Sequence, residues 1–184
     1  MPLLKTDPGI SLMRDIIKSE SLDQDVVDTW FYSLTFYKTP TRAMLTVLST
    51  FLEPNPHHSA LLGISSLAST FCAAQTDCLQ FAEIRDLVKR LELLLGTNCD
   101  TSTKEEEDTM VLVLKGMRNI GLMTDSSDIL AGCYKTKSNP MWVRVAAVET
   151  VQSLACHYPE QQFDLLGSFT DIQEDSELRI AVYR

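Results

Sequence analysis

The side chains in this sequence that could carry chemistry are cysteines, histidines, an acidic run and a row of hydroxyls. The 5 cysteines lie at positions 72, 78, 99, 133 and 156. None forms a Cys-x-x-Cys pair, and the histidines at 57, 58 and 157 are not spaced from them as zinc ligands usually are. One interpretation is five buried free thiols, because reduced cysteine packs as a small hydrophobic side chain. An odd count leaves at least one cysteine unpaired or bonded to another chain.

Two of these cysteines enclose a distinctive segment. Cys99 and Cys133 bracket an acidic loop, a long amphipathic run and a second, shorter apolar run. This layout suits a helix pair clamped by one disulfide, with buried free thiols as the alternative. The choice bears on localisation, because structural disulfides persist in oxidising compartments and are rare in the cytosol.

Two further groups could bind ions. His57 and His58 could be combined with Cys72 or Cys78 into a metal site, but their place in the first turn of a predicted helix, among Pro and Ser, favours a solvated surface. The acidic run 105–108 could bind a cation or a basic partner. A helix N-terminus attracts negative side chains by its dipole, and this explains the run more simply. We therefore predict no metal site.

A catalytic centre is not expected either. Ser65, Ser66, Ser69 and Thr70 form a hydroxyl-rich stripe close to the histidine pair in the sequence, but no strand–turn–helix context supports a nucleophile there. No glycine-rich phosphate loop occurs. The sequence thus predicts a scaffold without a cofactor, and not an enzyme.

Aromatic side chains crowd one predicted helix. They are Trp30, Phe31, Tyr32, Phe36 and Tyr37. Core packing is the first interpretation of such a cluster. A helix that is aromatic on more than one face also suits contact with another domain or with lipid.

The elements that must position these residues are helices. Apolar residues recur at helical spacing almost throughout, and no segment alternates strictly with a period of two. Pro40, Pro56 and Pro140 each follow Thr or Asn and indicate helix starts, with Pro40 expected as the first helical residue. Gly96 is expected just beyond a helix end. We predict an all-α fold of about ten helices joined by short loops.

A weak internal repeat runs through the C-terminal half. VRVAAV at 143–148 recurs as LRIAVY at 178–183, and the run 112–120 occupies the equivalent place one repeat earlier. A small residue lies within each such helix, and small residues let neighbouring helices approach closely; they are Gly63, Gly116, Ala147 and Ala181. Repeats of this length are typical of stacked helix pairs, as in HEAT or armadillo arrays. An irregular helix bundle is the alternative.

Composition excludes several classes of protein. Hydrophobic residues make up 45% of the 184 residues, which is typical of a globular chain with its own core. The formal net charge of −9 disfavours nucleic acid, which is bound through Lys and Arg. No apolar run is long enough to span a membrane. The first residues, Met-Pro-Leu-Leu, are too short for a signal peptide.

Four stretches, in order, resemble the helical domain of the large lipid transfer proteins: apolipophorin, apolipoprotein B, vitellogenin and the microsomal triglyceride transfer protein. They are SLMRDIIKS (11–19), NCDTSTKEEEDTMVLVLKGMRNIG (98–121), NPMWVRVAAVETVQSL (139–154) and DSELRIAVYR (175–184). The last is similar to the family's "DxELRIAAY" segment and is the most specific of the four. Together they span nearly the whole chain.

The resemblance implies a pairing of the cysteines. In the family, the two cysteines that match Cys99 and Cys133 form a disulfide, which implies the same bond here. Cys72 and Cys78 resemble a second pair that many members have. Cys156 has no family partner that can be assigned, so this pairing leaves one free thiol.

The resemblance also implies a fold and a function. The fold is a two-layered, right-handed α-superhelix of HEAT-like helix pairs, with residues 1–184 forming part of a single helical domain truncated at both ends. In the family this arc wraps around β-sheets that line a lipid cavity. The implied function is lipid transport by a secreted lipoprotein, whose partners are lipid and the other domains of the same chain, with no nucleic acid and no transmembrane segment.

A second hypothesis belongs to another class of protein. An intracellular HEAT-like adapter would bind protein partners on a concave face, and its acidic charge would select basic partners. It requires five reduced cysteines, whereas the lipid carrier requires one. A thiol count on the denatured, unreduced protein separates the two hypotheses.

Overall fold

The computed structural model describes residues 6–19, 22–52, 56–124, 128–154, 159, 165–168 and 170–183. Every regular element in these ranges is a helix, and they contain no strand. The prediction of an all-α fold is therefore confirmed. Cys156 lies outside the described residues.

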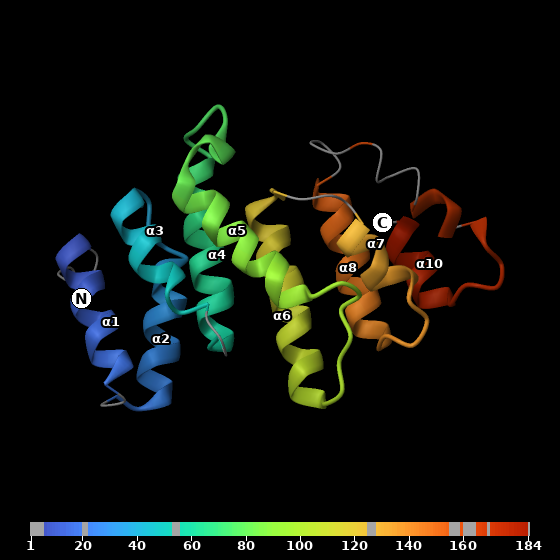
Figure 1. The fold of residues 1–184 in the computed structure, drawn as a ribbon, viewed down its shortest axis with the longest axis horizontal. Coiled ribbons are helices and arrows are strands. Elements are labelled where there is room, and N and C mark those ends of the chain that lie inside the picture. Colours follow the sequence, from blue (N-terminus) through green and yellow to red (C-terminus); the bar gives the residue numbers. More distant parts are fainter. Residues whose placement is uncertain are drawn as a thin grey trace. The chain divides into compact units, whose positions relative to one another are not determined.

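Figure 1 shows the helices in chain order. Their bounds are α1 (Asp7–Lys18), α2 (Gln24–Leu34), α3 (Arg42–Ser49), α4 (His58–Cys72), the 3₁₀-helix η2 (Cys78–Gln80), α5 (Ala82–Leu95), α6 (Lys104–Ile120), α7 (Asp128–Lys135), α8 (Met141–Leu154) and α10 (Ser176–Tyr183). The chain forms two compact units, residues 1–90 and 91–184, and each is described by itself. None of the helices in the described part of the chain is long and apolar enough to cross a membrane.

Local sequence signals explain most helix ends, with one correction. Gly96 and Gly121 lie just beyond α5 and α6 with φ of 63° and 71°, the left-handed conformation that glycine adopts without cost. The sequence predicted Pro40 as the first residue of a helix, and this prediction is wrong. The helix α3 begins two residues later, because the hydroxyl of Thr41 accepts the N–H of Met44 and caps the helix.

In unit 1, α2 and α4 lie side by side and run in the same direction. Gln24 lies beside His57, the Ser59 hydroxyl donates to Asp28 at 2.6 Å, and Phe31 lies against Gly63 further along both helices. Trp30 and Phe31 of α2 and Phe51, which follows α3, are buried, and their rings pack edge to face. The centroids of Phe31 and Phe51 are 5.1 Å apart. The core packing predicted for the aromatic helix is thus confirmed for Trp30 and Phe31.

The close approach of α2 and α4 depends on Gly63. A Cβ atom added at this glycine would lie 2.3 Å from the backbone oxygen of Phe31. Backbone in a packed helix cannot move aside as a flexible side chain can. The predicted role of a small residue in this helix is therefore confirmed.

Gly63→Ala is expected to lower the free energy of unfolding by about 2 kcal/mol. Overpacking at this contact costs about 3 kcal/mol, and the better helix propensity of alanine returns about 1 kcal/mol. Urea unfolding followed by circular dichroism measures the difference. Gly167→Ala is the matched control, because a Cβ there meets nothing within 4 Å. A Gly63→Ala protein as stable as the wild type would contradict the close packing.

In unit 2, the three repeat segments fall on α6, α8 and α10. The helix α8 packs against α6 on one side and α10 on another, and α7 also contacts it. The Thr150 hydroxyl donates to the backbone oxygen of Leu114 at 3.0 Å and joins α8 to α6. Gly116, Ala147 and Ala181 are buried, as the close-approach hypothesis requires. The repeat in the sequence therefore corresponds to stacked helices, as in an α-superhelix.

Candidate functional site

The feature that the sequence singled out, the segment between Cys99 and Cys133, forms a tight junction in unit 2. The structure places the Sγ atoms of Cys99 and Cys133 1.98 Å apart and their Cα atoms 4.9 Å apart, within the range for a disulfide. Cys99 follows the end of α5 and Cys133 lies in α7, and both side chains are fully buried. This contact ties the α5–α6 connection to α7.

Two neighbouring residues fit α7 closely against the same loop. A Cβ added at Gly132 would lie 2.8 Å from the backbone oxygen of Thr97, so only glycine fits there without movement. The buried amide of Asn139 donates to the backbone oxygens of Asn98 at 2.6 Å and Cys133 at 2.9 Å. Asn139 therefore joins the connection before α8 to the loop that contains Asn98. Its position before Pro140 in the sequence had not indicated this role.

Cys99 itself has an uncommon backbone conformation. Its φ is +57°, and among the residues that the structure describes it alone has a positive φ without being glycine. Left-handed geometry costs an L-residue roughly 1–2 kcal/mol, so the surrounding contacts must hold it. The contacts adjoining it are the Cys133 side chain, which meets its Sγ, and the Asn139 amide, which binds the backbone oxygen of the preceding Asn98.

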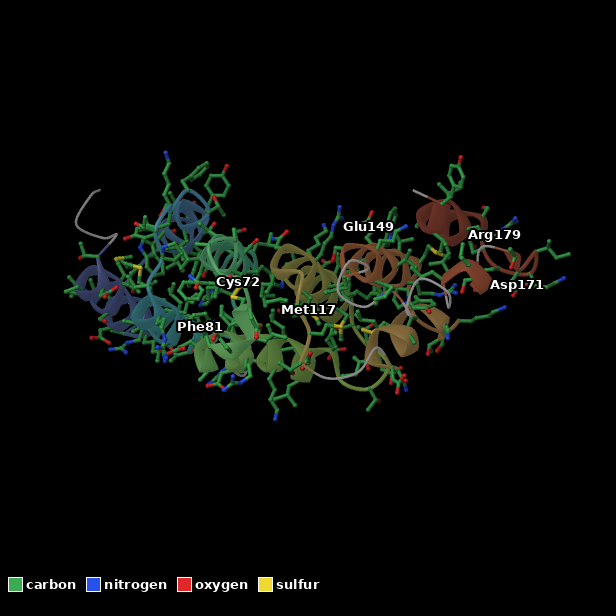
Figure 2. The ribbon with its side chains drawn as sticks, turned by 90° about the horizontal axis from the view of Figure 1, so that it is seen from above. Cys72, Phe81, Met117, Glu149, Asp171 and Arg179 are labelled. Atoms are coloured by element: carbon green, nitrogen blue, oxygen red, sulfur yellow. A yellow bond between two sulfur atoms is a disulfide. The ribbon has the colours of Figure 1, made fainter. Side chains whose placement is uncertain are left out.

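The second cysteine pair lies in unit 1. Cys72, labelled in Figure 2, ends α4, and Cys78 begins η2; their Sγ atoms are 1.98 Å apart. Phe71 and Phe81 pack edge to face beside them, with centroids 5.2 Å apart. The pair closes a short loop and is expected to fix the turn between α4 and α5. The oxidised state of both pairs remains a prediction, tested below by a thiol count.

A buried ion pair, which the sequence analysis missed, holds the segment between α8 and α10. Arg144 in α8 has 4% of its side chain exposed and contacts the Glu174 carboxylate, 9% exposed, at 2.9 Å. Its Nε also donates to the backbone oxygen of Tyr134 at 2.8 Å. Arg144 thus joins α7, α8 and the turn before α10. An arginine inside an otherwise apolar helix segment, VRVAAV, was the available signal.

The surroundings of Glu174 favour its ionised form. Burial alone would raise the pKa of this carboxyl, but the Asp175 backbone N–H and the Arg144 guanidinium both stabilise the carboxylate. Its pKa therefore lies below the ordinary value for glutamate. Glu174 is therefore a carboxylate at neutral pH.

The acidic run 105–108 lies at the start of α6, and Glu106 takes part in the cap of this helix. Thr103 accepts the N–H of Glu106 at 3.2 Å, and the Glu106 carboxylate accepts the Thr103 N–H in return at 3.1 Å, which is a capping box. Lys104 pairs with Glu107 at 3.0 Å and with Asp108 at 3.2 Å. The interpretation of the acidic run as the start of a helix is confirmed by this geometry.

The other candidate groups do not converge. His57 caps the start of α4 without a side-chain bond to the helix and stacks near Phe31, with ring centroids 6.4 Å apart. Ser65 is buried, whereas Ser66, Ser69 and Thr70 are half-buried on α4. Among the described residues no group of histidine, cysteine and acidic side chains could hold a metal ion. The junction at Cys99–Cys133 and the Arg144 network both join helices of unit 2 to connecting segments.

Comparison with known proteins identifies the kind of chain this is. The family model for the Vitellogenin TPR domain matches residues 1–184. The chain is 28% identical to apolipophorins of Locusta migratoria over 185 residues, covering 98% of this chain and 5% of that protein. Apolipophorins of Manduca sexta are 28% identical over 183 residues (97% of this chain, 5% of theirs), and those of Drosophila melanogaster 30% identical over 153 residues (82% and 4%).

The matches cover nearly all of this chain but only a small part of each relative. The chain spans about 5% of the length of the first two apolipophorins. The resemblance found in four sequence stretches therefore extends over the entire chain. Because the family model matches every residue from 1 to 184, the chain belongs to the vitellogenin TPR domain family.

Proposed function

We propose that this chain is a helical segment of a secreted lipid carrier, and that its helices brace a lipid-binding β-sheet assembly formed elsewhere in the same protein. The observation that carries the proposal is the full-length family match together with the similarity to apolipophorins. Lipid is then a ligand of the whole protein. Residues 1–184 are one part of a single helical domain, and catalysis is not part of its role.

The internal contacts support a bracing role. A brace must keep its helices in a fixed arrangement while other domains press on it. In unit 2, three contacts restrict the movement of the helices. They are the Cys99–Cys133 pair, the close fit at Gly132 and the buried Arg144–Glu174 ion pair. The described part of the chain brings no perturbed acid–base groups together in a cleft, as an enzyme would need.

Localisation follows from the redox state of the cysteines. Two disulfides of this kind are expected in a secreted protein and not in a cytosolic adapter. Titration of the denatured, unreduced chain with a thiol reagent should find one free thiol, that of Cys156. Five free thiols would contradict secretion and favour the intracellular adapter. Reduction before titration is the control and should yield all 5 cysteines.

The bracing role is tested in the full-length protein. The purified protein should carry lipid, and chemical cross-linking with mass spectrometry should join lysines of this segment, such as Lys115 on α6, to β-rich segments beyond residue 184. A full-length protein that carries lipid but shows cross-links only within the helical segment would contradict bracing. A protein without lipid would contradict the carrier function itself.

A further inference from the structure

The aromatic helix α2 divides its rings between the core and the surface. Trp30 and Phe31 are buried, whereas Tyr32 is 63% exposed and Phe36, just beyond the helix end, is 61% exposed. The two exposed rings pack edge to face with centroids 5.3 Å apart. Packing on each other leaves most of both rings in contact with water. We call Tyr32, Phe36 and the adjoining exposed Lys38 the aromatic tip.

The charges around the aromatic tip are unusual for so acidic a protein. The chain has 25 acidic residues, yet none between positions 29 and 52. The neighbouring helix α4 packs against α2 and contributes no Asp, Glu, Lys or Arg over its whole length. The tip is therefore apolar and weakly basic, within a chain of net charge −9.

Three acids that adjoin the acid-free stretch 29–52 or bind to it have hydrogen-bond or ion-pair partners. On α2, Asp28 accepts from Ser59 at 2.6 Å and from Gln24 at 2.9 Å, and Asp25 lies about two helical turns from Tyr32. Asp7 accepts from Thr41 at 2.6 Å. Glu83 is bound by Arg42 at 2.8 Å, so this pair adds no net charge.

We propose that the aromatic tip contacts a phospholipid surface at the boundary between headgroups and acyl chains. Tyrosine suits this boundary because its ring prefers the apolar side and its hydroxyl the wet side. Phe36 would enter the acyl region, and Lys38 would reach lipid phosphates with its flexible side chain. An acid-free surface is required, because carboxylates are repelled by phosphates. This contact goes beyond the bracing role, since a brace needs no lipid contact of its own, and the two proposals fail separately.

The test is flotation of the 184-residue chain with vesicles of phosphatidylcholine, and with vesicles of phosphatidylcholine and phosphatidylserine. The wild type should float with both and more strongly with the anionic vesicles. Tyr32→Ser/Phe36→Ser should weaken binding to both by about tenfold, from the loss of two rings that would be buried in lipid. Lys38→Gln should weaken binding to the anionic vesicles by about fivefold, and binding to the phosphatidylcholine vesicles by less, because these carry no net charge.

The matched control is Leu12→Ser/Val26→Ser. These residues are 55% and 47% exposed on α1 and on another part of α2, so the control removes exposed apolar surface from the same unit without touching the tip. It should change binding less than about twofold. Circular dichroism should show the same helix content in all variants, because every substituted side chain is exposed.

Three outcomes would overturn the proposal. One is a wild type that does not float with either vesicle. Another is equal weakening by the tip variant and the control, which would mean general surface hydrophobicity. The third is self-association, measured by sedimentation in the absence of lipid, that the tip variant abolishes; the tip would then be covered by a second copy of the chain.

Discussion

Replacing Cys99 and Cys133 together by alanine is expected to lower the free energy of unfolding by about 4 kcal/mol. A disulfide restricts the unfolded chain more when it closes a longer loop, and these cysteines are separated by 34 positions. The change should appear as a lower urea midpoint in circular dichroism. Reduction of the wild type by dithiothreitol should lower the midpoint further, because it also opens the Cys72–Cys78 pair. In the variant, dithiothreitol should lower the midpoint only by the smaller effect of the Cys72–Cys78 pair.

The other cysteine pair provides the comparison. Cys72 and Cys78 are separated by only 6 positions, and their replacement by alanine should cost about 2 kcal/mol. The larger effect should therefore belong to the pair at 99 and 133. If the Cys99→Ala/Cys133→Ala protein unfolds at the wild-type midpoint and reduction has no effect, the two residues are not bonded in solution.

Arg144→Ala is expected to lower the free energy of unfolding at pH 7 by about 3 kcal/mol. It leaves the buried Glu174 carboxylate without its cation and the backbone oxygen of Tyr134 without its donor. The matched control is Arg118→Ala, which removes an ion pair with Glu149 of similar length, 2.7 Å, but with side chains 49% and 36% exposed. That variant should lose less than about 1 kcal/mol. Equal losses in the two variants would contradict a special role for the buried pair.

The difference between wild type and Arg144→Ala should depend on pH in a defined direction. The pKa of Glu174 is lowered in the folded protein, so the unfolded chain binds the proton more tightly. The stabilisation is then present at neutral pH and is lost as the pH falls from about 4.3, the ordinary glutamate value, through the lower folded value. Unfolding measured from pH 7 to pH 3 should show the two stabilities converging. A difference that is constant over this range would assign the loss to packing and not to the ion pair.

The sequence predicted the fold class well, because its signals are local. Helical spacing of apolar residues, the left-handed Gly96 and the acidic start of α6 each depend on residues a few positions apart. The prediction was wrong at the start of α3. Pro40 indicated one helix start, but the hydroxyl of Thr41 caps the helix, which therefore begins at Arg42. Such one- or two-residue errors are expected where two helix-start signals lie next to each other.

The candidate site was only partly legible. The segment between Cys99 and Cys133 could be singled out, because cysteine spacing and a family resemblance are properties of the sequence. The partners of Asn139 and Arg144 could not, because Asn98 and Glu174 lie 41 and 30 positions away in the chain, and only folding brings them together. A buried Arg in an apolar helix, or a buried Asn in the connection before one, requires a partner, but the sequence does not say which one.

The sequence by itself therefore determined that this protein is an array of helices, because helical spacing of apolar residues is a short-range property, and which family it resembles. Helical spacing of Val27, Trp30, Phe31 and Leu34 already indicates which face of α2 is buried. Tertiary structure decided the place of Phe36, because this ring lies beyond the end of α2, where helical spacing no longer applies, and it is 61% exposed. It also decided that Gly63 is a contact point, because a 2.3 Å approach to the backbone of Phe31 arises only when two helices have already packed.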